Sequence, residues 1–261
     1  MAIINEKELE SNKNIKVKSL YKALLLLDYF KETNKSALSA TELAQLSGLL
    51  VTSVHNIMST FMEYGLIQKN PVNHKYSLGK KFVDFSNIYT TQNPIQKEFS
   101  RIMRNLCEES GETVLLAVPY GTDVLYLDSA SPKNSFTPSS KMFGVTAPMY
   151  CTAIGKAILS ISGENVIQQV VQQEKTAFTE NTLLDGNDFI NEINTTMHRG
   201  YAIDNMEHEY GVKCVAVAVK AEGQIYGLSI TGPSLRFPVE KIETYALKLL
   251  AIKQAISSSH R

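Results

Sequence analysis

Residues 39–65 read SATELAQLSGLLVTSVHNIMSTFMEYG, and they hold the clearest helix signals at the front of the chain. Ser39 stands three residues before Glu42, the spacing of a capping box at a helix start. Gly48 is suited to end that helix. A second helix is expected from Thr52 to Gly65, because apolar residues recur there at helical spacing. Two short helices joined by a tight turn predict a helix-turn-helix unit.

The flanking segments complete a winged helix. Before the unit, Leu20, Ala23, Leu24, Leu27 and Phe30 form one apolar stripe at helical period, which predicts a further helix. After it, residues 66–69 and 74–78 are extended pieces around an Asn/Pro turn, which predicts a hairpin. Three helices followed by this hairpin are typical of a winged DNA-binding domain.

The outward face of the helix after the turn is the candidate DNA-reading surface. It lies opposite the apolar stripe and carries short polar side chains. Such side chains can bond base edges or phosphates in the major groove. The alternative is an ordinary solvated helix face, on which long Lys/Glu pairs are commoner. The candidate reading residues are Thr52, Ser53, His55, Asn56, Ser59 and Thr60.

Charge supports a nucleic-acid partner for the front of the chain only. The whole chain has 26 basic and 26 acidic residues, which excludes a uniformly basic coat protein. Residues 13–90, however, hold ten lysines and five acids, a balance of +5. Lysines would contact phosphates and position the protein without reading sequence. The candidates are Lys18, Lys22 and Lys75, joined by Tyr76 in the wing.

Composition indicates a protein of the cytoplasm. Its three cysteines, Cys107, Cys151 and Cys214, are odd in number and widely spaced, so no disulfide framework is expected. The first residues are polar and do not resemble a signal peptide. The longest apolar runs have five residues, whereas a membrane span needs about 20. No membrane partner is therefore expected.

The back half predicts an α+β domain with an antiparallel sheet. Residues 113–118 and 124–128 are strand-like, and residues 214–220 and 224–231 form a second candidate hairpin. Helices are expected at 153–161, 164–171, 188–199 and 239–257, with an earlier one ending near Gly111. Strand pairs that alternate with helices are typical of the α+β class.

Ordered motifs over residues 15–256 resemble the IclR family of bacterial transcriptional regulators. They include Leu43–Leu49, Lys75–Gly79, Gly144–Pro148, Arg199–Glu209 and Ser229–Phe237. The resemblance implies a ligand-responsive, sequence-specific DNA-binding regulator, more often a repressor, without enzymatic activity or a cofactor. As partners it implies operator DNA and a small-molecule effector, and as assembly a homodimer or a dimer of dimers.

The same resemblance implies the domain plan. A disordered or extended tail is expected over residues 1–14, the winged helix over 15–79, a linker helix over 80–93, and a GAF-like effector domain over 94–261. Two positions depart from the family pattern. The family often has a basic residue where this chain has Val51, and commonly an arginine where it has Asn56. Phosphate anchoring is therefore expected to depend on lysines outside the recognition helix.

The resemblance also carries over an effector pocket, expected to take an organic acid or a sugar acid. An anion would be favoured at the helix that begins at Ala153, where free N–H groups and the helix dipole attract it. Ser229 and Thr231 are two apart and share one strand face. On their own, these two can be ordinary strand residues and Cys214 an ordinary buried thiol. The expected effector-binding residues are Ser139, Met142, Ala147, Ala153, Ile154, Asp204, Cys214, Ser229 and Thr231.

Two alternatives remain open at this point. Asp204, Glu207, His208 and Glu209 cluster in sequence, and with cysteines they would offer zinc ligands, although the spacing is no tight metal signature. The back domain can also be an enzyme acting through the same pocket. No G-x-S-x-G elbow, P-loop or dinucleotide fingerprint supports that reading, so no catalytic or metal residue is assigned.

Overall fold

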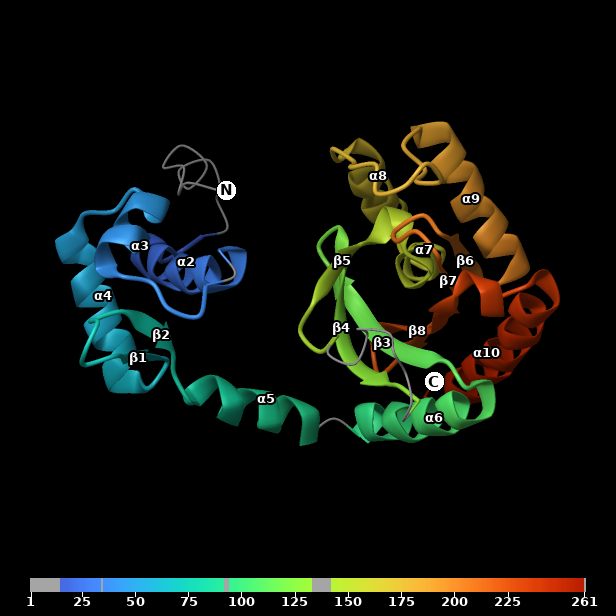
Figure 1. The fold of residues 1–261 in the computed structure, drawn as a ribbon, viewed down its shortest axis with the longest axis horizontal. Helices are drawn as coiled ribbons and strands as arrows, with labels where there is room; N and C mark the ends of the chain where they lie inside the picture. The colour runs from blue at the N-terminus through green and yellow to red at the C-terminus, as the bar shows by residue number, and fades with distance from the viewer. Residues whose placement is uncertain (1–14, 34, 92–93, 133–141, 261) are drawn as a thin grey trace. The chain divides into compact units, whose positions relative to one another are not determined.

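The computed structural model describes residues 15–33, 35–91, 94–132 and 142–260, and Figure 1 labels its helices and strands. The chain forms two compact units, Met1–Asn93 and Pro94–Arg261. The expected tail, residues 1–14, lies outside the described residues. None of the described helices is both long and apolar enough to cross a membrane.

The first unit contains the predicted helix-turn-helix. Its helices are α2 (Lys18–Glu32), α3 (Ala40–Ser47) and α4 (Val51–Tyr64). The capping box is confirmed, since the Ser39 hydroxyl accepts from the Glu42 N–H and the Glu42 carboxylate accepts from the Ser39 N–H. Gly48 ends α3 with a φ of 72°, the left-handed conformation that glycine adopts without strain. The N-cap expected at Thr52 is wrong, because α4 starts one residue earlier and Leu50 caps it without a side-chain bond.

The wing and the helix after it follow directly. Strands β1 (Ile67–Lys69) and β2 (Tyr76–Leu78) pair antiparallel, and Leu38 bridges to Tyr76 outside the hairpin. Helix α5 (Lys81–Thr91) occupies the segment expected to be a linker helix.

The apolar stripe predicted on the first helix is covered only in part: Phe30 is buried, and Ala23 and Leu27 pack against the same core. The helix forms, but Leu20 and Leu24 are 54% and 46% exposed, and the buried side chains are Leu26, Tyr29 and Phe30. Val17 and Tyr21 extend the exposed stripe at the same helical spacing. Helix α2 therefore has two apolar faces, and only one of them packs inside its own unit.

The second unit is built on a six-stranded sheet in which every neighbouring pair is antiparallel. The strand order is β5-β4-β3-β8-β7-β6. The strands are β3 (Thr113–Tyr120), β4 (Asp123–Ala130), β5 (Thr146–Pro148), β6 (Ala202–Asn205), β7 (Val212–Ala221) and β8 (Gln224–Pro233). The α+β class and the antiparallel sheet are thus confirmed. The short strands β5 and β6 were not predicted.

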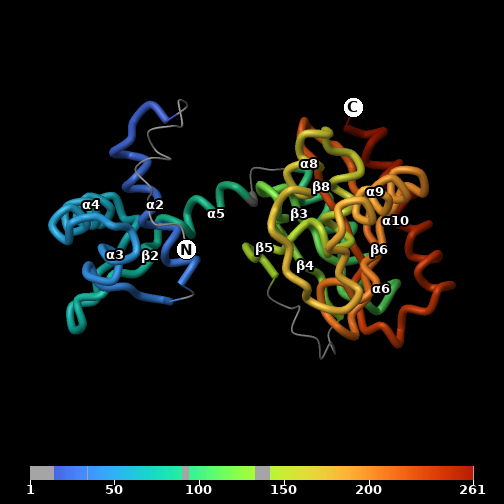
Figure 2. Tube along the Cα trace, turned by 90° about the horizontal axis from the view of Figure 1, so that it is seen from above, coloured from blue at the N-terminus to red at the C-terminus, as the bar shows by residue number. Residues whose placement is uncertain are grey.

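Helices cover both faces of this sheet. The helices are α6 (Pro94–Ser110), α7 (Ala153–Leu159), α8 (Glu164–Gln172), α9 (Gly186–Arg199) and α10 (Val239–Ser259), with short 3-10 turns η2 (Met149–Cys151) and η3 (Ser234–Arg236). Helices α6 and α10 pack on one face and α7 to α9 on the other. Figures 1 and 2 show the curled sheet, with α7 inside its curve.

Period-2 alternation explains the two cores. On β7, Val215, Val217 and Val219 face the α6/α10 side, whereas Ala216 and Ala218 face α7. Small residues on the α7 side allow a close approach. Gly227 on β8 is required there, since a Cβ at this position would collide with Ile154 and Ile158 of α7.

Candidate functional site

The outward face of α4 is accessible over most of its predicted residues. Thr52, His55, Asn56, Ser59 and Thr60 are exposed, and Ser53 is half-buried. The Thr60 hydroxyl donates to the main-chain carbonyl of Asn56 at 3.1 Å, which turns it back on the helix. The opposite face, with Val54, Met58 and Phe61, is buried. The polar face is therefore free to meet a partner.

Tyr76 does not fit the DNA contact expected of it. Its side chain is 1% exposed, and its phenol lies 2.9 Å from Nδ1 of His55. The alternation of β2 turns Tyr76 inward, toward the packed side of the hairpin. Its place is behind α4, where its phenol contacts His55, one of the candidate reading residues.

The candidate lysines differ in their surroundings. Lys18 is exposed at the start of α2, whereas Lys22 is half-buried. The Lys75 ammonium lies 3.2 Å from Glu42, which also meets Lys35 at 3.0 Å. The Ser39 N–H and then these two lysines lower the pKa of Glu42 to about 2. Lys75 therefore links the wing to the start of α3 as well as offering positive charge.

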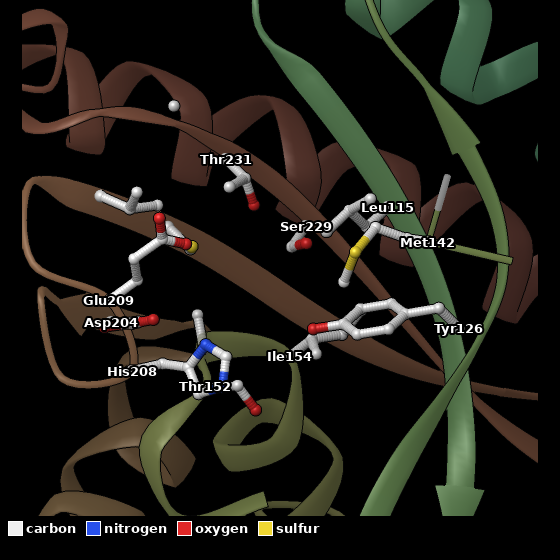
Figure 3. Close-up of a pocket in the computed structure, with 14 residues that line it drawn as sticks. Leu115, Tyr126, Met142, Thr152, Ile154, Asp204, His208, Glu209, Ser229 and Thr231 are labelled. Carbon is white, nitrogen blue, oxygen red and sulfur yellow. The ribbon is translucent and has the colours of Figure 1, made fainter. Parts of the chain in front are cut away.

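A cavity of about 230 Å³ lies between the sheet and the start of α7, as Figure 3 shows. At about 30 Å³ per water it holds the volume of roughly eight waters, which suits a compact ligand. Of the predicted effector residues, it is lined by Met142, Ala153, Ile154, Asp204, Cys214, Ser229 and Thr231.

Two expected effector residues are not placed there. Ala147 lies on β5, is 4% exposed, and packs in the core around α7 without lining the cavity. Its strand pairs with β4, which directs its small side chain into that core. Ser139 lies outside the described residues.

Sequence reasoning missed seven other lining residues: Leu115, Tyr126, Thr152, His208, Glu209, Val212 and Gly232. Leu115 lies beside Ser229 on the neighbouring strand, a relation that the strand register sets and that no local motif reveals. Thr152 caps α7 by accepting from the Gly155 N–H, a signal readable as an N-cap threonine. Tyr126 carries no local motif.

Strand register explains how distant polar residues meet. Asp204 on β6 lies directly opposite Cys214 on β7, and Cys214 lies directly opposite Thr231 on β8. The three side chains therefore form one row across the sheet, on the side that faces α7. The hydroxyls of Thr231 and Ser229 are buried without a hydrogen-bond partner. Unsatisfied buried hydroxyls at a cavity wall are groups that a polar ligand would satisfy.

A buried ion pair stands behind this row. Nζ of Lys156, on α7, lies 2.6 Å from Oε1 of Glu207 and 3.5 Å from Glu192, and Lys156 is 1% exposed. The Glu207 N–H donates to Oδ1 of Asp204 at 2.7 Å. Burial, and then the charge of Glu207, raise the pKa of Asp204 to about 7.

Three further groups that line the cavity, His208, Cys214 and Tyr126, favour their neutral forms. Burial lowers the pKa of His208 and raises that of Cys214 well above its usual value. Burial also raises the pKa of the Tyr126 phenol. A neutral thiol is a poor nucleophile and a poor metal ligand. Among the described residues, no group of three His, Cys, Asp or Glu side chains is arranged to hold a metal ion.

Two family descriptions match the chain. Residues 19–71 match the IclR helix-turn-helix domain, and residues 87–258 match the bacterial transcriptional regulator IclR C-terminal domain. The chain belongs to the IclR family.

Similar proteins support this membership over nearly the whole length. The transcriptional regulator XynR of Escherichia coli is 30% identical over 78% of this chain and 80% of its own. The acetate operon repressor of Salmonella typhimurium is 30% identical over 91% and 88%. An IclR-type regulator from Silicibacter sp. TM1040 has a similar solved structure, with a TM-score of 0.82, 24% identity, and coverage of 92% of this chain and 95% of that one.

Membership settles the class of activity. Members of the IclR family are transcriptional regulators and not enzymes, so the enzyme alternative is set aside. This chain is accordingly a ligand-responsive DNA-binding regulator, with a helix-turn-helix at its front and a ligand domain at its back.

Proposed function

We propose that this IclR-family member is a repressor whose operator affinity is changed by a small organic or sugar acid bound in the α7 cavity. The observation that carries the proposal is the pair of unpartnered buried hydroxyls, Ser229 and Thr231, at the wall of a cavity in the ligand domain. Similar proteins that are named as repressors support the direction of control. The protein then acts where the chromosome lies, in the cytoplasm.

The DNA contacts divide into reading and anchoring. We assign reading to the exposed face of α4 and anchoring to lysines around it, because short polar side chains suit base edges and ammonium groups suit phosphates. Tyr76 supports the reading face from behind. The proposed set is Lys18, Lys22, Thr52, Ser53, His55, Asn56, Ser59, Thr60 and Lys75.

The effector contacts come from four elements. Ser229 and Thr231 supply donors from β8, Asp204 lies opposite Cys214 across β6 and β7, and Ala153 with Ile154 form the first turn of α7. Met142 closes the apolar side near the Tyr126 ring (Figure 3). The hydroxyl, thiol and carboxyl groups of Ser229, Thr231, Cys214 and Asp204 in a small cavity favour a compact polar acid over a large apolar ligand.

We further propose a homodimer, with association into a dimer of dimers as its larger form. One recognition helix reads a half-site only, so a symmetric operator needs two heads. The exposed stripe on α2, formed by Val17, Leu20, Tyr21 and Leu24, is suited to pack against a second copy. The effector would then favour one spacing of the two heads over the other.

A mobility-shift experiment tests the proposed function. The probe is the DNA just upstream of the protein's own gene, at fixed salt, against random competitor. Specific retention, and its release by one acid from a panel of small organic and sugar acids, is the expected result. Retention that random DNA abolishes equally, on this DNA and on the flanks of neighbouring genes, would refute sequence-specific repression.

A further inference from the structure

The effector cavity contains carboxylates but no strong cation. Asp204 and Glu209 line it, and among its described lining residues there is no lysine or arginine. His208 is the remaining basic group, and burial lowers its pKa, so its imidazole is neutral near pH 7. An anionic effector in this cavity therefore meets carboxyl side chains and, among the described lining residues, no cationic side chain.

The nearest buried cation is already neutralised. Lys156 meets Glu207 at 2.6 Å and Glu192 at 3.5 Å, and Arg199 meets Glu192 at 2.8 Å. Two cations and two carboxylates balance one another in this network. Lys156 also does not line the cavity. An ionised Asp204 would be a surplus buried charge beside a balanced network, which is unfavourable in a low-dielectric interior.

The groups that face Asp204 do not remove this surplus. Asp204 is 3% exposed, and its carboxyl accepts from the main-chain N–H groups of Glu207 and His208, which only partly offset the cost of burial. The titratable or charged groups around it are Glu207, His208 and Glu209 on its own loop, Cys214 on β7, Lys156 on α7, Cys151 on η2 and Tyr126 on β4. Burial raises the pKa of both thiols, so these stay neutral. Burial likewise favours the protonated form of Asp204, with a pKa of about 7.

We propose that the cavity binds its carboxylate effector together with one proton, which Asp204 carries and donates to the effector. Ser229 and Thr231, which lack partners, donate the other hydrogen bonds to the same carboxylate. The inference rests on the proposed function, since it takes this cavity to be the effector site. The proton comes from solvent, so one effector anion and one proton enter together. The effector class is then a small carboxylic acid, whose anion and one proton together carry no net charge into the cavity.

The consequence is a defined dependence of affinity on pH. Below the pH at which Asp204 loses its proton, the dissociation constant of a carboxylate is constant. Above it, each pH unit weakens binding about tenfold, because an extra proton must be taken up. A primary amide of the same acid behaves differently, since its NH₂ group can donate to the ionised Asp204. Amide binding therefore requires no proton.

Isothermal titration of the full chain tests this. The probes are benzoate, pyruvate and gluconate, each beside its primary amide, between pH 6 and 8.5 in phosphate and in Tris. For a carboxylate that binds, we expect a Kd that is flat to about pH 7 and then rises tenfold per unit, with uptake of about one proton at pH 8. Asp204→Asn should abolish the slope, and the matched control Glu209→Gln, at the other cavity carboxylate, should keep it.

Two results would overturn the proposal: a carboxylate Kd that is independent of pH in the unmodified protein, or a slope that survives Asp204→Asn. A measurement without ligand decides the case even where no probe binds. With ¹³C-labelled aspartate, the Asp204 carboxyl resonance, assigned by its loss in Asp204→Asn, should titrate near pH 7, and a midpoint near pH 4 would refute the proposal. Failure of the proposed function gives a different result. In that case a carboxylate would bind together with a proton, but its binding would leave operator affinity unchanged.

Discussion

The phenol of Tyr76 lies 2.9 Å from Nδ1 of His55, which joins the wing to the recognition helix by one hydrogen bond. Tyr76 is buried and His55 is exposed, so the bond connects the packed interior of the domain with the surface assigned to DNA. The imidazole orientation is thereby set before DNA arrives. A pre-oriented side chain loses less conformational freedom on binding than a mobile one.

Tyr76→Phe tests this arrangement. The ring and its packing are kept and only the hydroxyl is lost, so we expect the fold to persist and operator affinity to fall by about 0.5–1.5 kcal/mol, the cost of immobilising one side chain on binding. A titrated mobility shift measures the change, and circular dichroism checks the fold. If Tyr76→Phe leaves affinity intact while His55→Ala lowers it, His55 reads DNA without help from the wing.

Asn56→Ala is expected to weaken operator binding selectively. Asn56 is exposed on the reading face, and an asparagine bonded to an adenine edge contributes about 1–3 kcal/mol of discrimination. Affinity for random DNA should stay unchanged. Fluorescence anisotropy on operator and on random duplex separates the two effects. Equal losses on both duplexes would remove Asn56 from the reading set.

Lys75→Ala tests phosphate anchoring, as Asn56→Ala tests base reading. Its removal should weaken binding to every duplex and reduce the slope of log K against log salt by about one. Because Lys75 is also paired with Glu42, the slope and not the affinity alone is the decisive readout. An unchanged slope would restrict Lys75 to its ion pair.

The fold was largely predictable because its signals are local. The capping box at Ser39, the glycine stop at Gly48 and the hairpin turns each act within a few residues. The inward face of α2 was not predictable in the same way. Periodicity reveals an apolar stripe but does not say whether the chain itself or a second copy covers it, and Leu20 and Leu24 are left exposed.

The site was predictable only in part for a related reason. Asp204, Cys214 and Thr231 meet because strand register aligns them, although they are far apart in sequence. The pairing of Lys156 with Glu207 has no sequence signature, since 51 positions separate the two residues. The prediction for Ala147 was wrong although its motif position matches the family. The pairing of its short strand directs the side chain into the core and not into the cavity.

The exposed stripe on α2 gives a prediction about assembly. Leu20→Glu combined with Leu24→Glu places two charges on a face that we assign to a second copy, so self-association should weaken at least about tenfold, equivalent to roughly 1.4 kcal/mol. Sedimentation velocity over a concentration series measures it. Val72→Glu, at an 87% exposed apolar residue of the wing, is the control and should leave the mass unchanged. An unaltered mass in the double variant would show that the exposed stripe on α2 is not part of the self-association interface.

The Lys156–Glu207 pair predicts a pattern of stability. Lys156→Met leaves a buried carboxylate without its cation, and such removal costs about 3–5 kcal/mol of unfolding free energy. Adding Glu207→Gln to Lys156→Met removes the stranded charge, so the double variant should be more stable than the single one. Urea unfolding followed by circular dichroism measures both. A single variant within about 1 kcal/mol of the unmodified protein would mean that Glu207 takes up a proton, or that water reaches it, once Lys156 is gone.

Asp204 predicts the pH dependence of stability. Its pKa is raised from 3.8 to about 7 in the folded chain, so the folded state holds the proton more tightly than the unfolded state. The stabilisation is therefore complete below about pH 4 and is lost as the pH rises to about 7. A shift of this size corresponds to a change on the order of 4 kcal/mol.

The variant Asp204→Asn has no titratable group at this position and serves as the reference. Relative to it, the unmodified protein should lose unfolding free energy between about pH 4 and 7. Above about pH 7 the difference in unfolding free energy between the two proteins should stay constant. Urea titrations at several pH values, with Glu209→Gln as control, measure the difference. Parallel curves for the unmodified protein and Asp204→Asn would show that Asp204 titrates alike in the folded and unfolded chain.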